Sequence, residues 1–261
     1  MTQTPKRRIG PGIGAVLFGF AGLAACGGEV PAAVRTEPDG ALQAGASDEG
    51  RPEPDGGVVA LDPALLLPVD ERAVLISSHV TVAAALARAG QNSDAVQHLR
   101  LAISEIKPGG LTRLVENGFD PDLIDTTAAA LDSGAAPEDV EAQLVAIESN
   151  VAALREKAGG DPVPLIRLLV EHCQNAYRAG VSLDNQVADP IEYQDAYGYA
   201  ITAQELAGTL DSGDAGGLQL ELKMLALMWP AIGPVSGDLP APPMTFLAQV
   251  SRVESELSTL Q

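Results

Sequence analysis

Aromatic and basic residues are scarce in this chain. Its 261 residues include four Phe, four Tyr and one Trp, and this low aromatic content beside abundant Ala and Leu favours helices over sheet. Sixteen Lys and Arg are outnumbered by 35 Asp and Glu, which gives a net charge of −19. Because nucleic-acid backbones are bound through Lys and Arg, the sequence argues against DNA or RNA as a partner.

Several motifs of common catalytic sites are also missing. The sequence has no glycine-rich phosphate loop, no pair of closely spaced cysteines and no Ser-His-Asp order of the kind found in hydrolases. We therefore predict that the protein is not an enzyme. Only three histidines and two cysteines offer imidazole or thiol groups, namely His79, His98, His172, Cys26 and Cys173.

The first 26 residues have the order of a bacterial export signal. Basic residues at 6–8 precede an uncharged, largely apolar run at 9–23, and small residues then lead to a cysteine. The last four, Leu23-Ala24-Ala25-Cys26, resemble the lipobox of bacterial lipoproteins. The alternative is a transmembrane helix, but the run is about fifteen residues long, whereas about 20 are needed to span a bilayer.

The resemblance to lipoproteins implies a covalent lipid anchor at Cys26. In that family the sulfur carries diacylglycerol, the peptide bond before the cysteine is cut, and the new N-terminus receives a fatty acid. Removing residues 1–25 takes away three cations and no acids, so the net charge changes from −19 to −22. Lipidation leaves Cys173 without a cysteine to pair with. Because Gly27 rather than Asp follows Cys26, the resemblance implies an outer-membrane location facing the periplasm, rather than the inner membrane.

Composition divides the remaining chain into a tether and a folded domain. Residues 26–57 are rich in Gly, Pro, Ala and acids, with almost no bulky apolar side chain to offset the entropy of ordering, so we predict a disordered acidic linker. Residues 58–261 are long enough for one domain with a hydrophobic core.

The folded part is predicted to be all-α, an up-and-down bundle of about six to eight helices. Apolar residues recur at helical spacing, prolines stand near the predicted helix starts and glycines near the ends. The predicted helices cover 70–89, 93–106, 121–132, 137–158, 163–185, 189–211, 218–229 and 245–258.

The first predicted hairpin carries two histidines and a glutamate as candidate metal ligands. His79 lies on the apolar face of its helix, where a buried imidazole needs a partner. With a turn near 91–92, His79 is level with Glu105, whereas His98 lies about 10 Å closer to the turn at ~1.5 Å per residue. The alternative for His79 is a hydrogen-bonded core histidine.

A second candidate cluster follows Pro190. Glu192, Asp195 and Tyr199 are spaced i, i+3 and i+7, which places them on one helix face. Carboxylates and imidazoles that project from several helices into a bundle form metal sites in helical proteins. The alternative is that Glu192 and Asp195 only complement the helix dipole in the first turns.

These segments resemble the helical periplasmic region attached to bacterial iron permeases and its stand-alone relatives. The resemblance covers about 70–211 and rests on Ser78-His79, Ala87-Arg88-Ala89-Gly90, Ala95-Val96-Gln97-His98, Glu105 and Glu192-Tyr193-Gln194-Asp195-Ala196. Leu101 and Ala102 stand where that family often has a second histidine and a proline. The imelysin motif Gly-x-His-x-x-Glu fits less well, because Ser77 and Val82 flank His79 at its other two positions.

Two functions follow as expectations. The first is a lipid-anchored protein of the cell envelope that binds a metal ion, iron above all, or assists iron uptake, through His79, His98, Glu105, Glu192 and Asp195. The second is a non-catalytic structural or interaction lipoprotein, in which the same residues satisfy one another and the acidic helical surface docks an envelope protein.

Overall fold

The computed structural model describes residues 67–104, 110–235, 237 and 239–260. The chain divides into two units, Met1–Gly56 and Gly57–Gln261, and all of these residues belong to the second. The predicted anchor at Cys26, the predicted linker at 26–57 and the candidate ligand Glu105 lie outside the described residues.

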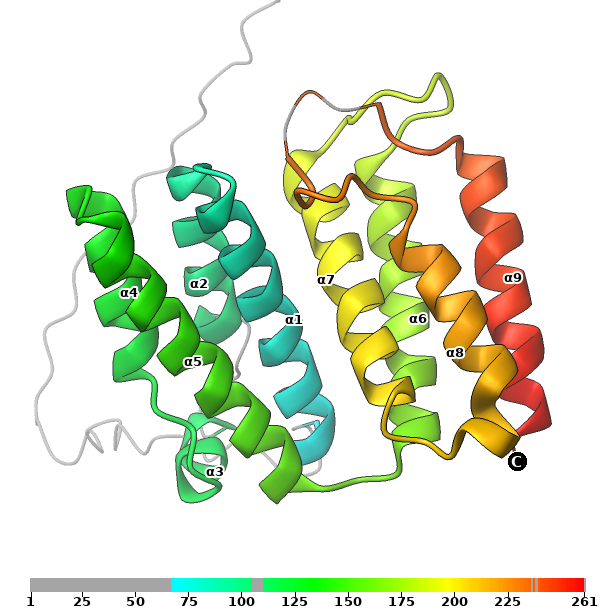
Figure 1. The fold of residues 1–261 in the computed structure, drawn as a ribbon, viewed down its shortest axis with the longest axis horizontal. Coiled ribbons are helices and arrows are strands. Elements are labelled where there is room, and N and C mark those ends of the chain that lie inside the picture. The colour runs from blue at the N-terminus through cyan, green and yellow to red at the C-terminus, as the bar shows by residue number, and fades with distance from the viewer. Residues whose placement is uncertain (1–66, 105–109, 236, 238, 261) are drawn as a thin grey trace, which may run out of the picture. The chain divides into compact units, whose positions relative to one another are not determined.

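The described residues form nine helices, and the predicted all-α class is confirmed (Figure 1). Their only bridge of β type is an isolated pair, Val181 with Val187. None of the helices within these ranges is both long and apolar enough to cross a membrane. The helices are α1 Val69–Arg88, α2 Asn92–Ser104, α3 Gly110–Glu116, α4 Asp122–Ser133, α5 Pro137–Ala158, α6 Pro162–Gly180, α7 Pro190–Ala207, α8 Ser212–Ala226 and α9 Pro243–Thr259.

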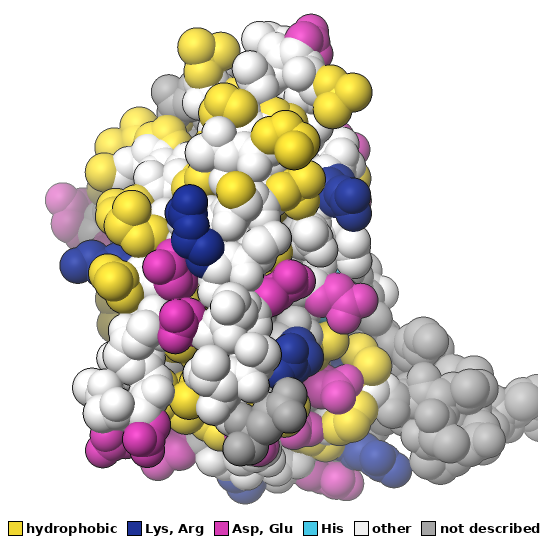
Figure 2. Space-filling view, turned by 90° about the vertical axis from the view of Figure 1, so that its right-hand side faces the viewer, with side chains coloured by type: hydrophobic (Ala, Val, Ile, Leu, Met, Phe, Trp, Pro, Cys, Tyr) yellow, Lys and Arg dark blue, Asp and Glu magenta, His cyan; other side chains and the backbone are white. Residues whose placement is uncertain are grey.

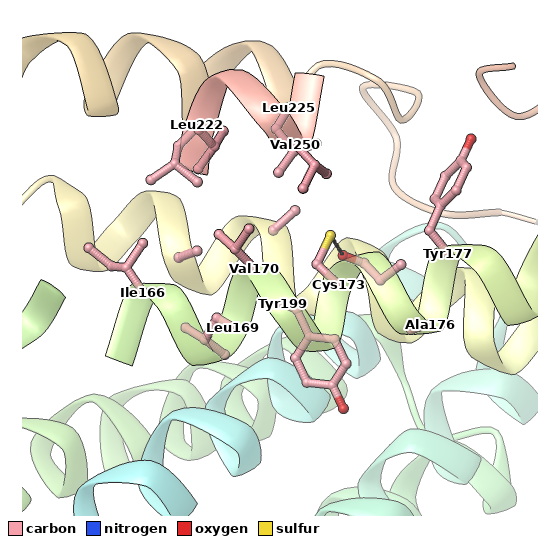
Figure 3. Packing of buried hydrophobic residues seen from close by; sticks show 14 of the residues in the cluster. Ile166, Leu169, Val170, Cys173, Ala176, Tyr177, Tyr199, Leu222, Leu225 and Val250 are labelled. Atoms are coloured by element: carbon pink, nitrogen blue, oxygen red, sulfur yellow. Dashed lines mark hydrogen bonds between the residues drawn. The ribbon is translucent and has the colours of Figure 1, made fainter. Parts of the chain in front are cut away.

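The unit has two hydrophobic cores, each enclosed by consecutive helices. One lies among α1 to α5 and includes Leu86, Leu99 and Ile147. The other lies among α6 to α9 and includes Ile166, Leu222 and Val250. Figure 3 shows Leu222 and Val250 on the opposite side of α6 from Tyr199. The two halves stand beside each other in Figure 1, and α1 joins them by packing on both α6 and α7.

The α1–α7 contact depends on a small residue. Gly198 of α7 faces α1 so closely that a Cβ there would lie 2.5 Å from the carbonyl oxygen of Ser78 and 2.5 Å from Cγ2 of Val82. Twelve of the twenty residues of α1 are buried, including His79, because α1 has neighbours on several sides. The glycine therefore brings the backbone of α7 against the turn of α1 that carries His79.

Aspartates and prolines begin the helices of the second half. Asp161, Asp189 and Asp211 each accept a hydrogen bond from a backbone N–H in the first turn of α6, α7 and α8. Pro162 and Pro190 occupy first-turn positions, where a missing N–H costs little.

Three predicted helix boundaries were wrong. The helix predicted for 163–185 ends at Gly180, because the carbonyl of Gly180 accepts the N–H of Ala188 and the chain turns back toward α7. The helix predicted for 189–211 ends at Ala207, and the next begins at Ser212 rather than 218, since Asp211 caps it. Helix α3 lies where the sequence indicated none.

Candidate metal centre

Three polar side chains converge where α1 and α2 meet α7. His79 is nine residues before the end of α1, and His98 is six residues after the start of α2. The turn between these helices is short, with Gly90 in the left-handed region at φ +79°. The two histidines are therefore at similar heights in the hairpin, and their ring centroids are 6.1 Å apart.

The common point of the cluster is one carboxylate oxygen. Nδ1 of His79 and Nδ1 of His98 each lie 3.1 Å from Oδ1 of Asp195. These three atoms all lie within 4.8 Å of one another. Within the described part of the chain, Oδ1 of Asp195 accepts no bond of good hydrogen-bond geometry despite these short contacts.

Burial makes these contacts energetically important. The His79 and His98 side chains are 2% and 0% exposed, and that of Asp195 is 12% exposed. Burial raises the pKa of the Asp195 carboxyl, but its interactions with His79 and then His98 outweigh burial and lower the pKa to about 2. Asp195 is therefore an anion in a nearly dry site, where it requires compensating positive charge.

A buried amide contacts Nε2 of His98, the ring nitrogen that does not face Asp195. Nε2 of His98 lies 2.8 Å from Oε1 of Gln194, which is 1% exposed. The other end of the amide, Nε2 of Gln194, donates to Oδ2 of Asp94 at 3.2 Å. Gln194 immediately precedes Asp195 on α7, so α7 supplies both the carboxylate of the cluster and the partner of one imidazole.

Tyr199 lies on the other side of the cluster. Its ring centroid is 6.3 Å from that of His79 and 5.3 Å from that of His172 on α6. Figure 3 shows Tyr199 on the opposite side of α6 from Leu222 and Val250. His172 is thus a neighbour of Tyr199 and does not belong to the group formed by His79, His98 and Asp195.

The structure brings together three of the five residues proposed as ligands. His79, His98 and Asp195 form the cluster, and Glu105 lies outside the described residues. Glu192 is half-buried in the first turn of α7, one turn before Asp195, and is not part of the group. The dipole interpretation alone does not describe Asp195, because it faces two imidazoles.

One geometric expectation differs from the structure. The turn was placed at 91–92, which set His98 about 10 Å from the level of His79; the actual turn at 89–91 and the approach of α7 bring both rings to one oxygen. Glu105, expected to be the centre of any site, lies outside the described residues, so this expectation stays a prediction, and the described residues converge on Asp195. Sequence reasoning missed Gln194 and Asp94 as partners of His98, because the motif that contains Gln194 assigns no role to its amide.

Cys173 is a core residue. It is fully buried, and its thiol donates to the carbonyl oxygen of Ala196 at 3.2 Å, the dashed line in Figure 3. Burial raises the pKa of this thiol far above its ordinary value. The cysteine therefore stays a neutral thiol and supplies no thiolate ligand.

No protein-family model, no curated protein and no solved structure matches this chain. The chemistry of the site consequently has to be argued from the donor set itself. Two imidazole nitrogens and a carboxylate oxygen are ligands for divalent transition metals, and three protein ligands leave further coordination positions open.

Proposed function

We propose that this protein binds one divalent transition-metal ion, iron in the first place, through His79, His98 and Asp195. The observation that carries the proposal is the convergence of two imidazole nitrogens on one buried carboxylate oxygen, at 3.1 Å each. Ligand atoms about 2.1 Å from a shared ion lie about 3.0–3.4 Å apart when they are neighbours in an octahedral or tetrahedral shell. The two measured separations fall in that range.

The choice of metal follows from the donor types. Two histidines and one carboxylate with open positions form the ligand set of non-haem Fe(II) sites, and Zn²⁺ accepts the same donors. The resemblance to the helical region of iron permeases favours iron. Glu105 stays a proposed additional ligand, because it follows His98 by seven residues in the sequence.

The location is part of the proposal. The lipobox at Leu23-Ala24-Ala25-Cys26 supports a protein held at the cell envelope by diacylglycerol and a fatty acid on Cys26. The net charge, which changes from −19 to −22 when residues 1–25 are removed, attracts cations to such a protein. We propose that it serves iron binding or uptake at the periplasmic side of the outer membrane.

Calorimetry on a soluble form of the mature chain tests metal binding. The protein is residues 26–261 with Cys26→Ser, titrated with Fe(II) under anaerobic conditions and separately with Zn²⁺. We expect one ion per chain, and His79→Ala should weaken binding by more than about 100-fold, since loss of an outer partner alone costs 10- to 100-fold. His172→Ala is the matched control, because His172 lies outside the cluster. No stoichiometric binding, or equal loss in both variants, would refute the proposal.

The alternative function is an interaction protein whose cluster is a metal-free ion-pair network. The lowered pKa of Asp195 favours it, since protonated imidazoles also compensate the buried carboxylate. The partner would then dock on the acidic surface, of which Figure 2 shows one face with Asp and Glu spread among basic and apolar side chains. Thermal unfolding separates the two: metal at 100 times its Kd adds about 2.7 kcal/mol to a metal-binding protein and nothing to the alternative.

A further inference from the structure

The buried amide of Gln194 and the carboxylate of Asp94 form a chain that leads from the half-buried start of α2 to the imidazole of His98. Gln194 lies on α7, while Asp94 and His98 lie one turn apart on α2. One amide thus bridges two residues of the neighbouring helix with bonds of 2.8 and 3.2 Å.

Donor and acceptor chemistry fixes the direction of every bond in this chain. A carboxylate only accepts, so the NH₂ group of Gln194 must face Asp94 and its oxygen must face His98. An amide oxygen also only accepts, so Nε2 of His98 must carry hydrogen. When His98 is neutral, its imidazole has one N–H, which leaves Nδ1 with its lone pair toward Asp195.

The inner side of the ring then faces a second acceptor. Nδ1 of His98 lies 3.1 Å from Oδ1 of Asp195, and neither atom has a partner with hydrogen-bond geometry among the described residues. A lone pair opposite a carboxylate oxygen is repulsive in a buried site unless a cation lies between them. The chain from Asp94 therefore prepares this nitrogen as a ligand before any ion arrives.

We propose that Gln194 and Asp94 are positioning residues that hold His98 in the tautomer with hydrogen on Nε2, so that Nδ1 is presented to a metal ion. The inference rests on the metal-binding function proposed above. It adds that the affinity of the site is set partly by an amide and a carboxylate that do not touch the ion. Histidine ligands in metal sites are commonly oriented in this way through their other nitrogen.

Paired substitutions at both positions test the inference. Gln194→Leu keeps the approximate volume but removes the acceptor, and it should weaken Co(II) binding about 10- to 100-fold and alter the Co(II) absorption spectrum. Asp94→Leu removes the group that orients the amide and should weaken binding in the same direction. Asp94→Asn can either accept from the Gln194 amide or donate to it, so it should fix the amide less firmly and weaken binding by less than Asp94→Leu does.

Nitrogen NMR of the metal-free protein, recorded at a pH where the spectrum shows neutral imidazole, supplies a second measurement. Hydrogen should reside on Nε2 of His98 in the wild type, become shared between Nε2 and Nδ1 in Asp94→Leu, and be shared to a smaller extent in Asp94→Asn. A residue with only a structural role would change the melting temperature without moving this proton.

The outcomes separate the two proposals. If the wild type binds no Co(II), Fe(II) or Zn²⁺, the metal-binding function fails and this inference fails with it. If the wild type binds metal but Gln194→Leu and Asp94→Leu keep its affinity, spectrum and tautomer, only the positioning role is overturned.

Discussion

At the scale of single residues, the candidate site is controlled by Asp195. It is the one described carboxylate that contacts two imidazoles, and its low exposure leaves little water to screen those contacts. The sequence predicted that His79, His98 and Asp195 are candidate ligands, since polar groups at apolar helix positions need partners. It did not predict that they converge on one atom, because convergence depends on where the turn at Gly90 and helix α7 lie.

Acid unfolding of the metal-free protein measures the interaction of Asp195 with the histidines. A folded-state pKa of about 2, against about 3.9 in the unfolded chain, contributes stability that is complete above pH ~4 and is lost as the pH falls through about 2. We expect the difference in free energy of unfolding between wild type and Asp195→Asn to shrink by about 2 kcal/mol over this window. Urea denaturation of both proteins at a series of pH values measures this difference. A difference that did not change with pH would contradict the low pKa assigned to Asp195.

The site's outer partners were not predictable by motif. Gln194 is a glutamine between Tyr193 and Asp195, and nothing in the local pattern distinguishes it from a solvent-facing residue. Its burial follows only when α7 packs against α1 and its amide reaches His98 of α2, which no local signal encodes. Glu192 lies outside the three-residue group that the described residues form, and its role as a ligand stays a prediction.

At the scale of helices, prolines and glycines in the sequence predicted most of the helix starts but fewer of the helix ends. Pro137, Pro162 and Pro190 stand at the first positions of α5, α6 and α7, as their fixed backbone angle requires. The end of α6 was misplaced because the apolar pattern continues beyond Gly180, whereas the backbone there is used by the turn into α7. Tertiary contact overrode local periodicity at that point.

The close approach of α1 and α7 gives a prediction at this scale. Gly198→Ala places a methyl group 2.5 Å from Ser78 O and Val82 Cγ2, so we expect the free energy of unfolding to fall by about 1–3 kcal/mol. The added methyl group should push α7 away from α1 and so move Asp195 away from His79. The affinity for metal should therefore fall as well. Chemical denaturation and calorimetry on the same samples measure both effects.

Gly216→Ala is the matched control for that change. Gly216 lies inside α8 with no atom within 4 Å of an added Cβ, so the substitution should raise the free energy of unfolding by up to about 1 kcal/mol. Metal affinity should not change. If both glycine variants had the same effect on stability, the close α1–α7 contact would not be the cause.

At the scale of the whole molecule, the class of fold was readable from composition and periodicity, and the all-α architecture agrees. The division into two cores that share α1 could not be predicted from the sequence, because every helix of the bundle carries similar Ala- and Leu-rich faces. The candidate site lies where helices of both halves meet, so its ligands come from segments about 100 residues apart in sequence. Only the assembled bundle places them together.

The proposed anchor belongs to this scale too. We expect the wild-type protein, produced in a bacterium that lipidates its lipoproteins, to enter the detergent phase on partitioning, and Cys26→Ser to stay in the aqueous phase. The melting temperature of the helical unit should be the same in both, because the substitution lies outside Gly57–Gln261. An aqueous wild-type protein with an unmodified cysteine would remove the basis for an envelope location.

The most direct test of the metal site is an anomalous-difference map from crystals of the mature chain grown with Co(II) or Fe(II). The account predicts one strong peak about 2 Å from Nδ1 of His79, Nδ1 of His98 and an oxygen of Asp195. A map with no peak at these three atoms, or with the ion bound only elsewhere on the acidic surface, would contradict it.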